Sequence, residues 1–186
     1  MSRAIRVIIL TMFNRYGRPV THLLWAILLF ASGAAGPISS TAEEIAAADH
    51  VVVHKSEHKL YLYSGNRLLG EYKVSLGLRP VGQKEREHDF KTPEGRYYLE
   101  RRNTRSDFFL AIQVSYPNKD DESRARKHRW APGGSIMIHG LPNAPRYPSD
   151  YYTSNDWTDG CIALSNSDMV EVWMRTQDNV PIDIYP

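Results

Sequence analysis

The chain has 186 residues, a length that suits one domain with a sizeable core and leaves too little for two. Its 23 basic and 21 acidic side chains give a formal charge of only +2, so it lacks the global basic field of a nucleic-acid-binding protein. It carries a single cysteine, which excludes an internal disulfide.

The N-terminal segment, residues 1–36, has the three parts of a secretory signal. Four arginines are followed by an apolar stretch at 23–31 and by small residues at 32–36. The apolar stretch is shorter than the ~20 residues of a spanning helix, which favours a cleaved signal over the alternative, an N-terminal anchor in the inner membrane. We therefore expect an exported protein of the periplasm or cell envelope, whose contact with a membrane is limited to this segment.

Residues 37–49, rich in alanine, serine and glutamate, are predicted to form a linker to a domain at 50–186. In that domain, apolar and polar residues alternate with period two, and turn residues separate the runs. The Gly65-Asn66 turn predicts a β-hairpin. Strands are predicted at 51–53, 60–63, 68–76, 96–100, 108–114, 135–139 and 180–185.

A helix is predicted after Ser165. Ser165 and Asp168 match a capping pattern, and Met169, Val172 and Trp173 then fall on one helical face. Many short strands with one or two short helices predict a mainly β fold, a sandwich or barrel.

Cys161 needs an explanation, because structural cysteines of exported proteins are normally paired. It follows Gly160 in a polar turn, and His139 ends a predicted strand 22 residues upstream. A buried structural cysteine is the alternative. A nearby imidazole promotes the nucleophilic thiolate, so we predict Cys161 as nucleophile and His139 as proton acceptor and donor. The backbone amides of Gly160 and Cys161 are the predicted oxyanion donors.

The order His139-Gly140, then Thr158-Asp159-Gly160-Cys161, resembles the L,D-transpeptidase (YkuD-type) catalytic domain of bacterial cell-wall enzymes. Residues 54–63, 74–77 and 91–95 resemble other signatures of that family, so the resemblance covers most of residues 50–186. Asp159 stands where the family usually has histidine, and Ala163 where it often has arginine.

The resemblance implies the L,D-transpeptidase catalytic fold and a peptidoglycan enzyme without a metal or organic cofactor. Its Cys161 attacks a tetrapeptide stem, and an amine acceptor resolves the thioester. A second stem peptide as acceptor gives a 3→3 cross-link, and a lysine gives an attached lipoprotein. Water as acceptor gives an L,D-carboxypeptidase. An amidase that trims stem peptides and a non-catalytic wall-binding module also remain open.

Three residues are candidates for substrate binding: Asp159, Tyr152 and Arg126. Asp159 is expected to orient the turn before the cysteine. Tyr152 belongs to the long 141–157 loop, expected to cap the thioester, and Arg126 to the basic run 124–129, expected to hold stem-peptide carboxylates. These two features favour transfer over hydrolysis. The competing interpretations are tyrosines packed under the loop and a solvated basic loop.

Rival chemistries fit the pattern less well. Papain-like hydrolases carry the cysteine before the histidine, and a sortase-like enzyme needs an arginine near the cysteine that is missing from the strand that follows. His50, His54 and His58 are spaced four apart, but a strand and turn would not align them for a metal.

Overall fold

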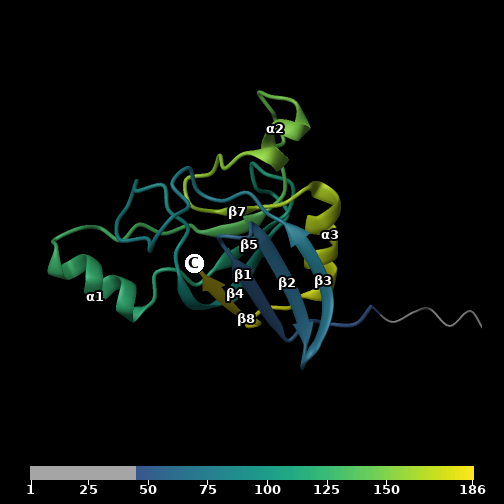
Figure 1. Ribbon diagram of the computed structural model, residues 1–186, viewed down its shortest axis with the longest axis horizontal. Coiled ribbons are helices and arrows are strands. Elements are labelled where there is room, and N and C mark those ends of the chain that lie inside the picture. The colour runs from purple at the N-terminus through teal and green to yellow at the C-terminus, as the bar shows by residue number, and fades with distance from the viewer. Residues whose placement is uncertain (1–44) are drawn as a thin grey trace, which may run out of the picture. The chain divides into compact units, whose positions relative to one another are not determined.

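Eight strands form one curled sheet in residues 45–186, the part of the chain that the computed structural model describes (Figure 1). The strand order is β3-β2-β1-β8-β4-β5-β6-β7. The predicted signal or anchor at 1–36 lies outside the described residues. The mainly β prediction is confirmed. The strands are β1 (His50–His54), β2 (Lys59–Ser64), β3 (Arg67–Lys73), β4 (Gly95–Asn103), β5 (Ala111–Val114), β6 (Met137–His139), β7 (Ile162–Ala163) and β8 (Pro181–Tyr185).

The predicted hairpin is present as the antiparallel pair β2–β3. Gly65 turns the chain with a φ of 56°, a left-handed conformation that glycine adopts without steric cost. The return strand ends at Lys73, three residues earlier than predicted. The chain beyond it makes isolated bridges, Ser75 to Ala163 and Gly77 to Thr158, and so runs alongside the turn that carries Cys161.

The C-terminal strand β8 joins the two halves of the sheet. It pairs in parallel with β1, where Val51 faces Ile182, and antiparallel with β4, where Tyr97 faces the same residue. All three side chains are almost fully buried. The alternating apolar residues of these strands supply one continuous core.

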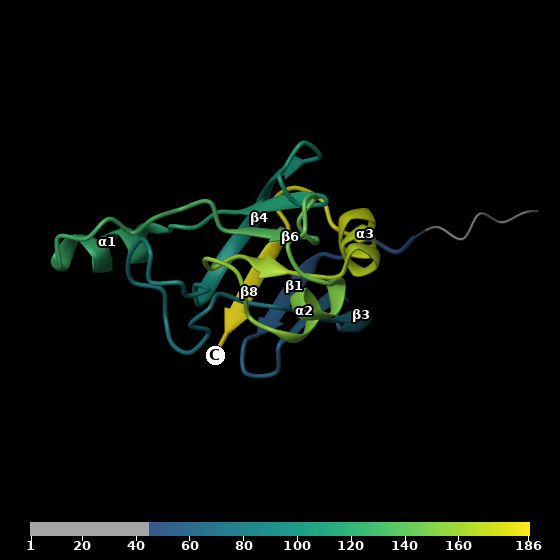
Figure 2. The ribbon, with the colours of Figure 1, turned by 90° about the horizontal axis from the view of Figure 1, so that it is seen from above.

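Three helices accompany the sheet in the described residues, whereas the sequence predicted one or two: α1 (Lys119–Lys127), α2 (Ser149–Ser154) and α3 (Asn166–Arg175). The predicted helix is α3, whose first turn is capped by the Ser165 hydroxyl accepting from the Asp168 amide. Met169 and Val172 bury its inner face, as predicted. Helices α1 and α3 lie at opposite sides of the domain in both views (Figures 1 and 2).

Helix α1 contains residues 124–127 of the basic run, which the sequence suggested as a loop. Asn118 and Asp121 cap it reciprocally, and Ala125 buries one face. A short helix with one buried alanine has too little apolar periodicity to be recognised from sequence.

The end of the predicted linker packs on the domain. Ala48 is buried and its amide donates to the carbonyl of Arg175, while Asp49 accepts from the amide of Gly65. In the described part of the chain, no helix has both the length and the apolar character needed to cross a membrane.

Candidate active site

His139 and Cys161 line the same cavity, which has a volume of about 370 Å³. Strands β6 and β7 are parallel neighbours, with Ile138 paired to Ile162 and His139 to Ala163. Cys161 is the residue directly before β7. In this register it lies two positions from His139 and on the same face of the sheet. The parallel pairing therefore joins two residues that are 22 positions apart in sequence.

The imidazole of His139 is held in one orientation and one tautomer. Its Nδ1 lies 2.7 Å from the carbonyl oxygen of Gly140, which can only accept, so Nδ1 carries the proton and Nε2 has a free lone pair. Phe108 stacks on the ring at a centroid distance of 4.1 Å, and Trp157 meets it edge-on at 5.6 Å. Burial lowers the pKa of His139 to about 4, so the ring is a neutral base at pH 7.

The thiol of Cys161 is half-buried and donates to the carbonyl of Ser135 at 3.6 Å. Burial raises the pKa of Cys161, and the nearby Asp159 carboxylate raises it further. The Met137 amide and the Lys84 ammonium act in the opposite direction. Burial thus disfavours both the thiolate and the imidazolium in the free protein. The imidazole-promoted thiolate expected from the sequence is not the state that this environment favours.

Thr158 fixes the turn before the cysteine. Its Oγ1 accepts from the Gly160 amide at 3.1 Å and donates to the Cys161 carbonyl at 2.7 Å. Gly160 has a φ of 131°, and a Cβ there would lie 2.6 Å from the Lys91 carbonyl oxygen, so only glycine fits. The amide of Gly160 thus already has an acceptor, which corrects its assignment as an oxyanion donor. The Cys161 amide makes no hydrogen bond to residues 45–186 and is the remaining candidate.

The three predicted substrate-binding residues have different positions. Asp159 is exposed at the cavity wall. Tyr152 is buried outside the cavity, and its hydroxyl accepts from the amides of Arg146 and Tyr147. Arg126 is exposed on α1 and pairs with Glu122. A direct substrate contact by Tyr152 or Arg126 is therefore not supported.

The two features expected to favour transfer lie away from the cavity. Of the 141–157 loop, only Trp157 is in its lining, and the basic run 124–129 contributes no lining residue. The alternative interpretation, in which tyrosines pack under the loop, describes Tyr152 correctly.

Lys84 and Phe108 are cavity residues that the sequence did not reveal. Both come from segments far from the motif, and neither carries a local pattern that marks it as functional. Lys84 stands in a polar stretch that resembles any solvated loop, yet its side chain is only 3% exposed.

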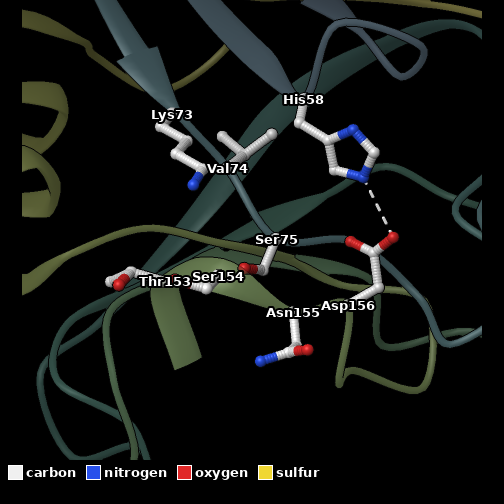
Figure 3. A pocket seen from close by; sticks show the side chains of 8 residues that line it. All are labelled: His58, Lys73, Val74, Ser75, Thr153, Ser154, Asn155 and Asp156. Atoms are coloured by element: carbon white, nitrogen blue, oxygen red, sulfur yellow. Dashed lines mark hydrogen bonds and ion pairs between the residues drawn. The ribbon is translucent and has the colours of Figure 1, made fainter. Parts of the chain in front are cut away.

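A second pocket, of about 270 Å³, lies between the end of β3 and the end of α2 (Figure 3). At its edge His58 Nε2 lies 2.9 Å from an Asp156 carboxylate oxygen, and the other oxygen accepts from the Leu76 amide. Asp156 precedes Trp157, which packs on His139. This contact thus ties the β1–β2 turn to the segment that packs on the imidazole of His139.

The other two spaced histidines have separate partners. His50 pairs with Asp183, and His54 stacks on Tyr185. Within residues 45–186, no group of three or more histidine, cysteine or acidic side chains is arranged to hold a metal.

The model of the L,D-transpeptidase catalytic domain, YkuD, matches residues 48–184. The chain belongs to the L,D-transpeptidase family. The curated protein "Putative L,D-transpeptidase YafK" of Escherichia coli K12 is 26% identical over 177 residues, 87% of this chain and 64% of that protein. The chain thus spans less than two thirds of the relative's length.

Solved structures agree with this assignment. The helical cell shape determining protein Pgp2 of Campylobacter jejuni is 29% identical, with a TM-score of 0.56 over 73% of this chain and 46% of that one. An L,D-transpeptidase from Xylanimonas cellulosilytica, 16% identical, has a TM-score of 0.50 over 75% of this chain and 61% of its own. The latter likeness shows the L,D-transpeptidase fold.

Proposed function

We propose that this protein is an exported peptidoglycan enzyme that transfers an acyl group from a tetrapeptide stem through a thioester on Cys161. One observation carries the proposal. The only thiol of the chain and a buried imidazole with a free Nε2 line one cavity, in a domain of the L,D-transpeptidase family. A non-catalytic wall-binding module would have no use for this pair.

In the acylation step, the Sγ of Cys161 attacks the carbonyl carbon between the third stem residue and D-alanine. The thiol proton passes to Nε2 of His139, and the Cys161 amide donates to the oxyanion. The carbon–nitrogen bond then breaks, and His139 returns its proton to the departing amine of D-alanine. The products are a thioester on Cys161 and free D-alanine.

In the second step, an acceptor amine attacks the thioester. Nε2 of His139 takes the proton of the attacking amine and passes it to the leaving sulfur of Cys161. The thiol is restored, and a new amide bond joins donor and acceptor. A second stem peptide as acceptor gives a 3→3 cross-link, and a protein lysine gives an attached lipoprotein.

Hydrolysis of the thioester is the second candidate function, and a specific observation favours it. The loop at 141–156 and the basic run 124–129, the features expected to exclude water and hold an acceptor, do not line the cavity. Water would then compete with the amine, and the product would be a tripeptide stem. We retain amine transfer as the leading proposal because it is the activity for which the family is named.

We also propose that the protein acts in the periplasm or cell envelope on wall architecture. Pgp2, a relative of known structure, is described as determining helical cell shape. Peptidoglycan lies outside the cytoplasmic membrane, which agrees with the predicted signal at the N-terminus.

Purified full-length protein incubated with a disaccharide tetrapeptide tests the proposal, with products identified by mass. We expect free D-alanine and a cross-linked dimer from the wild type, and neither from Cys161→Ala. Tripeptide without dimer would assign the protein as a carboxypeptidase. Turnover by a folded Cys161→Ala variant would refute the thioester mechanism.

A further inference from the structure

Lys84 is a buried cation in the lining of the cavity that holds Cys161. Its side chain is 3% exposed, and its Nζ donates to Asp89 at 2.7 Å and to the Arg86 carbonyl at 3.2 Å. Asp89 does not line the cavity, whereas Lys84 does. Lys84, the positive member of this ion pair, is therefore the member that belongs to the cavity of Cys161.

The ammonium has a donor to spare. It carries three N–H bonds, of which two have acceptors in residues 45–186, and its Nζ lies 5.9 Å from the centroid of the Tyr116 ring. Asp89 is itself held firmly: burial alone would raise its pKa, but Lys84 and the amides of Glu85, Arg86 and Lys91 together hold it below the usual value. The carboxylate and these amides thus fix Lys84 in place without using all of its donors.

The proposed acylation step needs such a group. His139 is a neutral base and Cys161 a neutral thiol, so negative charge develops on the sulfur and the substrate oxygen only during attack. A positive charge that is held in place in the cavity stabilises this developing negative charge without reorganising.

We propose that Lys84 is a charge-stabilising residue of this active site, whose buried ammonium offsets the negative charge that develops at Cys161 during attack. The inference rests on the proposed function, because the negative charge that Lys84 offsets develops in the proposed acylation step. Lys84 acts through the sulfur of Cys161 and is in this sense a positioning residue.

The other charged and titratable groups at the cavity wall are Glu87, His88, Asp159 and His139. Asp159, one residue before the glycine of the turn, raises the pKa of the thiol, whereas Lys84 lowers it. The two residues therefore act on the pKa of the thiol in opposite directions, and their removal is expected to have effects of opposite sign.

The test is the rate at which iodoacetamide alkylates Cys161 between pH 7 and 10, since only the thiolate reacts. Lys84→Met is expected to slow alkylation at pH 8 by about three- to tenfold, the change in thiolate fraction for a shift of roughly half to one pH unit. Asp159→Asn is expected to speed it, and Lys84→Arg to restore most of the wild-type rate.

Lys55→Met is the matched control. Lys55 is buried to the same degree, with a side chain 2% exposed and an ion pair to Glu94, but it does not line the cavity. Its loss should leave the alkylation profile unchanged. Circular dichroism and thermal unfolding show which variants fold, and Lys84→Gln replaces Lys84→Met if the latter does not.

An equal shift in Lys55→Met would assign the effect to general loosening of the fold and so refute the inference. An unchanged alkylation profile in a folded Lys84→Met variant would also refute it. Because alkylation needs no substrate, the inference and the proposed function fail separately. A wild type that cross-links stem peptides while its Lys84 variants keep the wild-type profile refutes the role of Lys84 alone. A wild type without activity on stem peptides refutes the proposed function alone.

Discussion

The low pKa of the buried His139 leads to a prediction about the free energy of unfolding at acidic pH. In the folded protein, burial lowers the pKa of this imidazole from 6.5 to about 4, whereas in the unfolded chain it returns to its usual value. Between these two values the unfolded state binds a proton that the folded state does not. The free energy of unfolding must therefore fall as pH drops from about 6.5 to about 4.

The size of this loss follows from the shift. A difference of about 2.5 units, at about 1.36 kcal/mol per unit, gives roughly 3 kcal/mol when the pH has reached about 4. His139 as a whole residue is 1% exposed, so solvent screens the effect little. Because domains are stable by about 5–15 kcal/mol, such a loss is large enough to measure.

This loss of stability can be measured by urea unfolding of the wild type and of His139→Gln at pH 7.5, 6.5, 5.5 and 4.5. Glutamine removes the titrating group, so the variant should lose less stability on acidification, and the difference should grow by about 1 kcal/mol per pH unit below pH 6. Carboxylates such as Asp89 and Asp183 contribute equally to both proteins and cancel in the comparison.

The control is His88→Asn, which replaces a histidine whose side chain is 83% exposed. Its curve should follow that of the wild type. Parallel loss of stability in the wild type and His139→Gln would refute the reasoning, because it would mean that the folded protein can protonate His139 at no cost.

Two further predictions concern Tyr152 and Arg126, which the sequence assigned to substrate binding and which do not line the cavity. Tyr152→Phe removes the acceptor for the amides of Arg146 and Tyr147, so it should cost about 1–3 kcal/mol in urea unfolding while kcat is retained. Loss of kcat in a variant that is still folded would restore Tyr152 as a substrate contact. Arg126→Ala removes only an exposed pair with Glu122 and should change the free energy of unfolding by less than about 0.5 kcal/mol and leave KM unchanged. An increase in KM would return Arg126 to the binding site.

The fold could be predicted from the sequence wherever local pattern and packing agree. The valine run of β1, the alternation in β2, the glycine turn at Gly65 and the serine cap of α3 are local signals, and the structure retains all four. Helix α2 has six residues, and α1 buries little apolar surface, so neither produces a readable hydrophobic period. Strand order was beyond reach, because the insertion of β8 between β1 and β4 depends on contacts far apart in the chain.

The sequence motif indicated which residues of the candidate site lie together. It did not predict the features of the site that depend on burial. The nearness of His139 and Cys161 followed from their order and spacing, and they line one cavity. The acceptor of the Gly160 amide is the hydroxyl of Thr158, two residues away, which the sequence contains but does not orient. The neutral states of the thiol and imidazole depend on how much water the folded domain excludes, a property of the whole core.

The neutral thiol has a consequence for a protein proposed to work outside the cytoplasm. Oxidants and disulfides react with thiolates, so a half-buried Cys161 whose pKa is raised resists both better than a thiolate kept permanently charged. The lack of a second cysteine also means that no internal disulfide can block the site.

A neutral thiol is, however, a weaker nucleophile than a thiolate, so Cys161 must be activated during attack. The proposed activation draws on three groups: the free Nε2 of His139 and the buried ammonium of Lys84, two residues that line the cavity with Cys161, and the unengaged amide of Cys161 itself. Each contributes most when the substrate displaces water from the cavity, since charges interact more strongly there as water leaves. Reactivity of this cysteine should therefore depend on an occupied cavity.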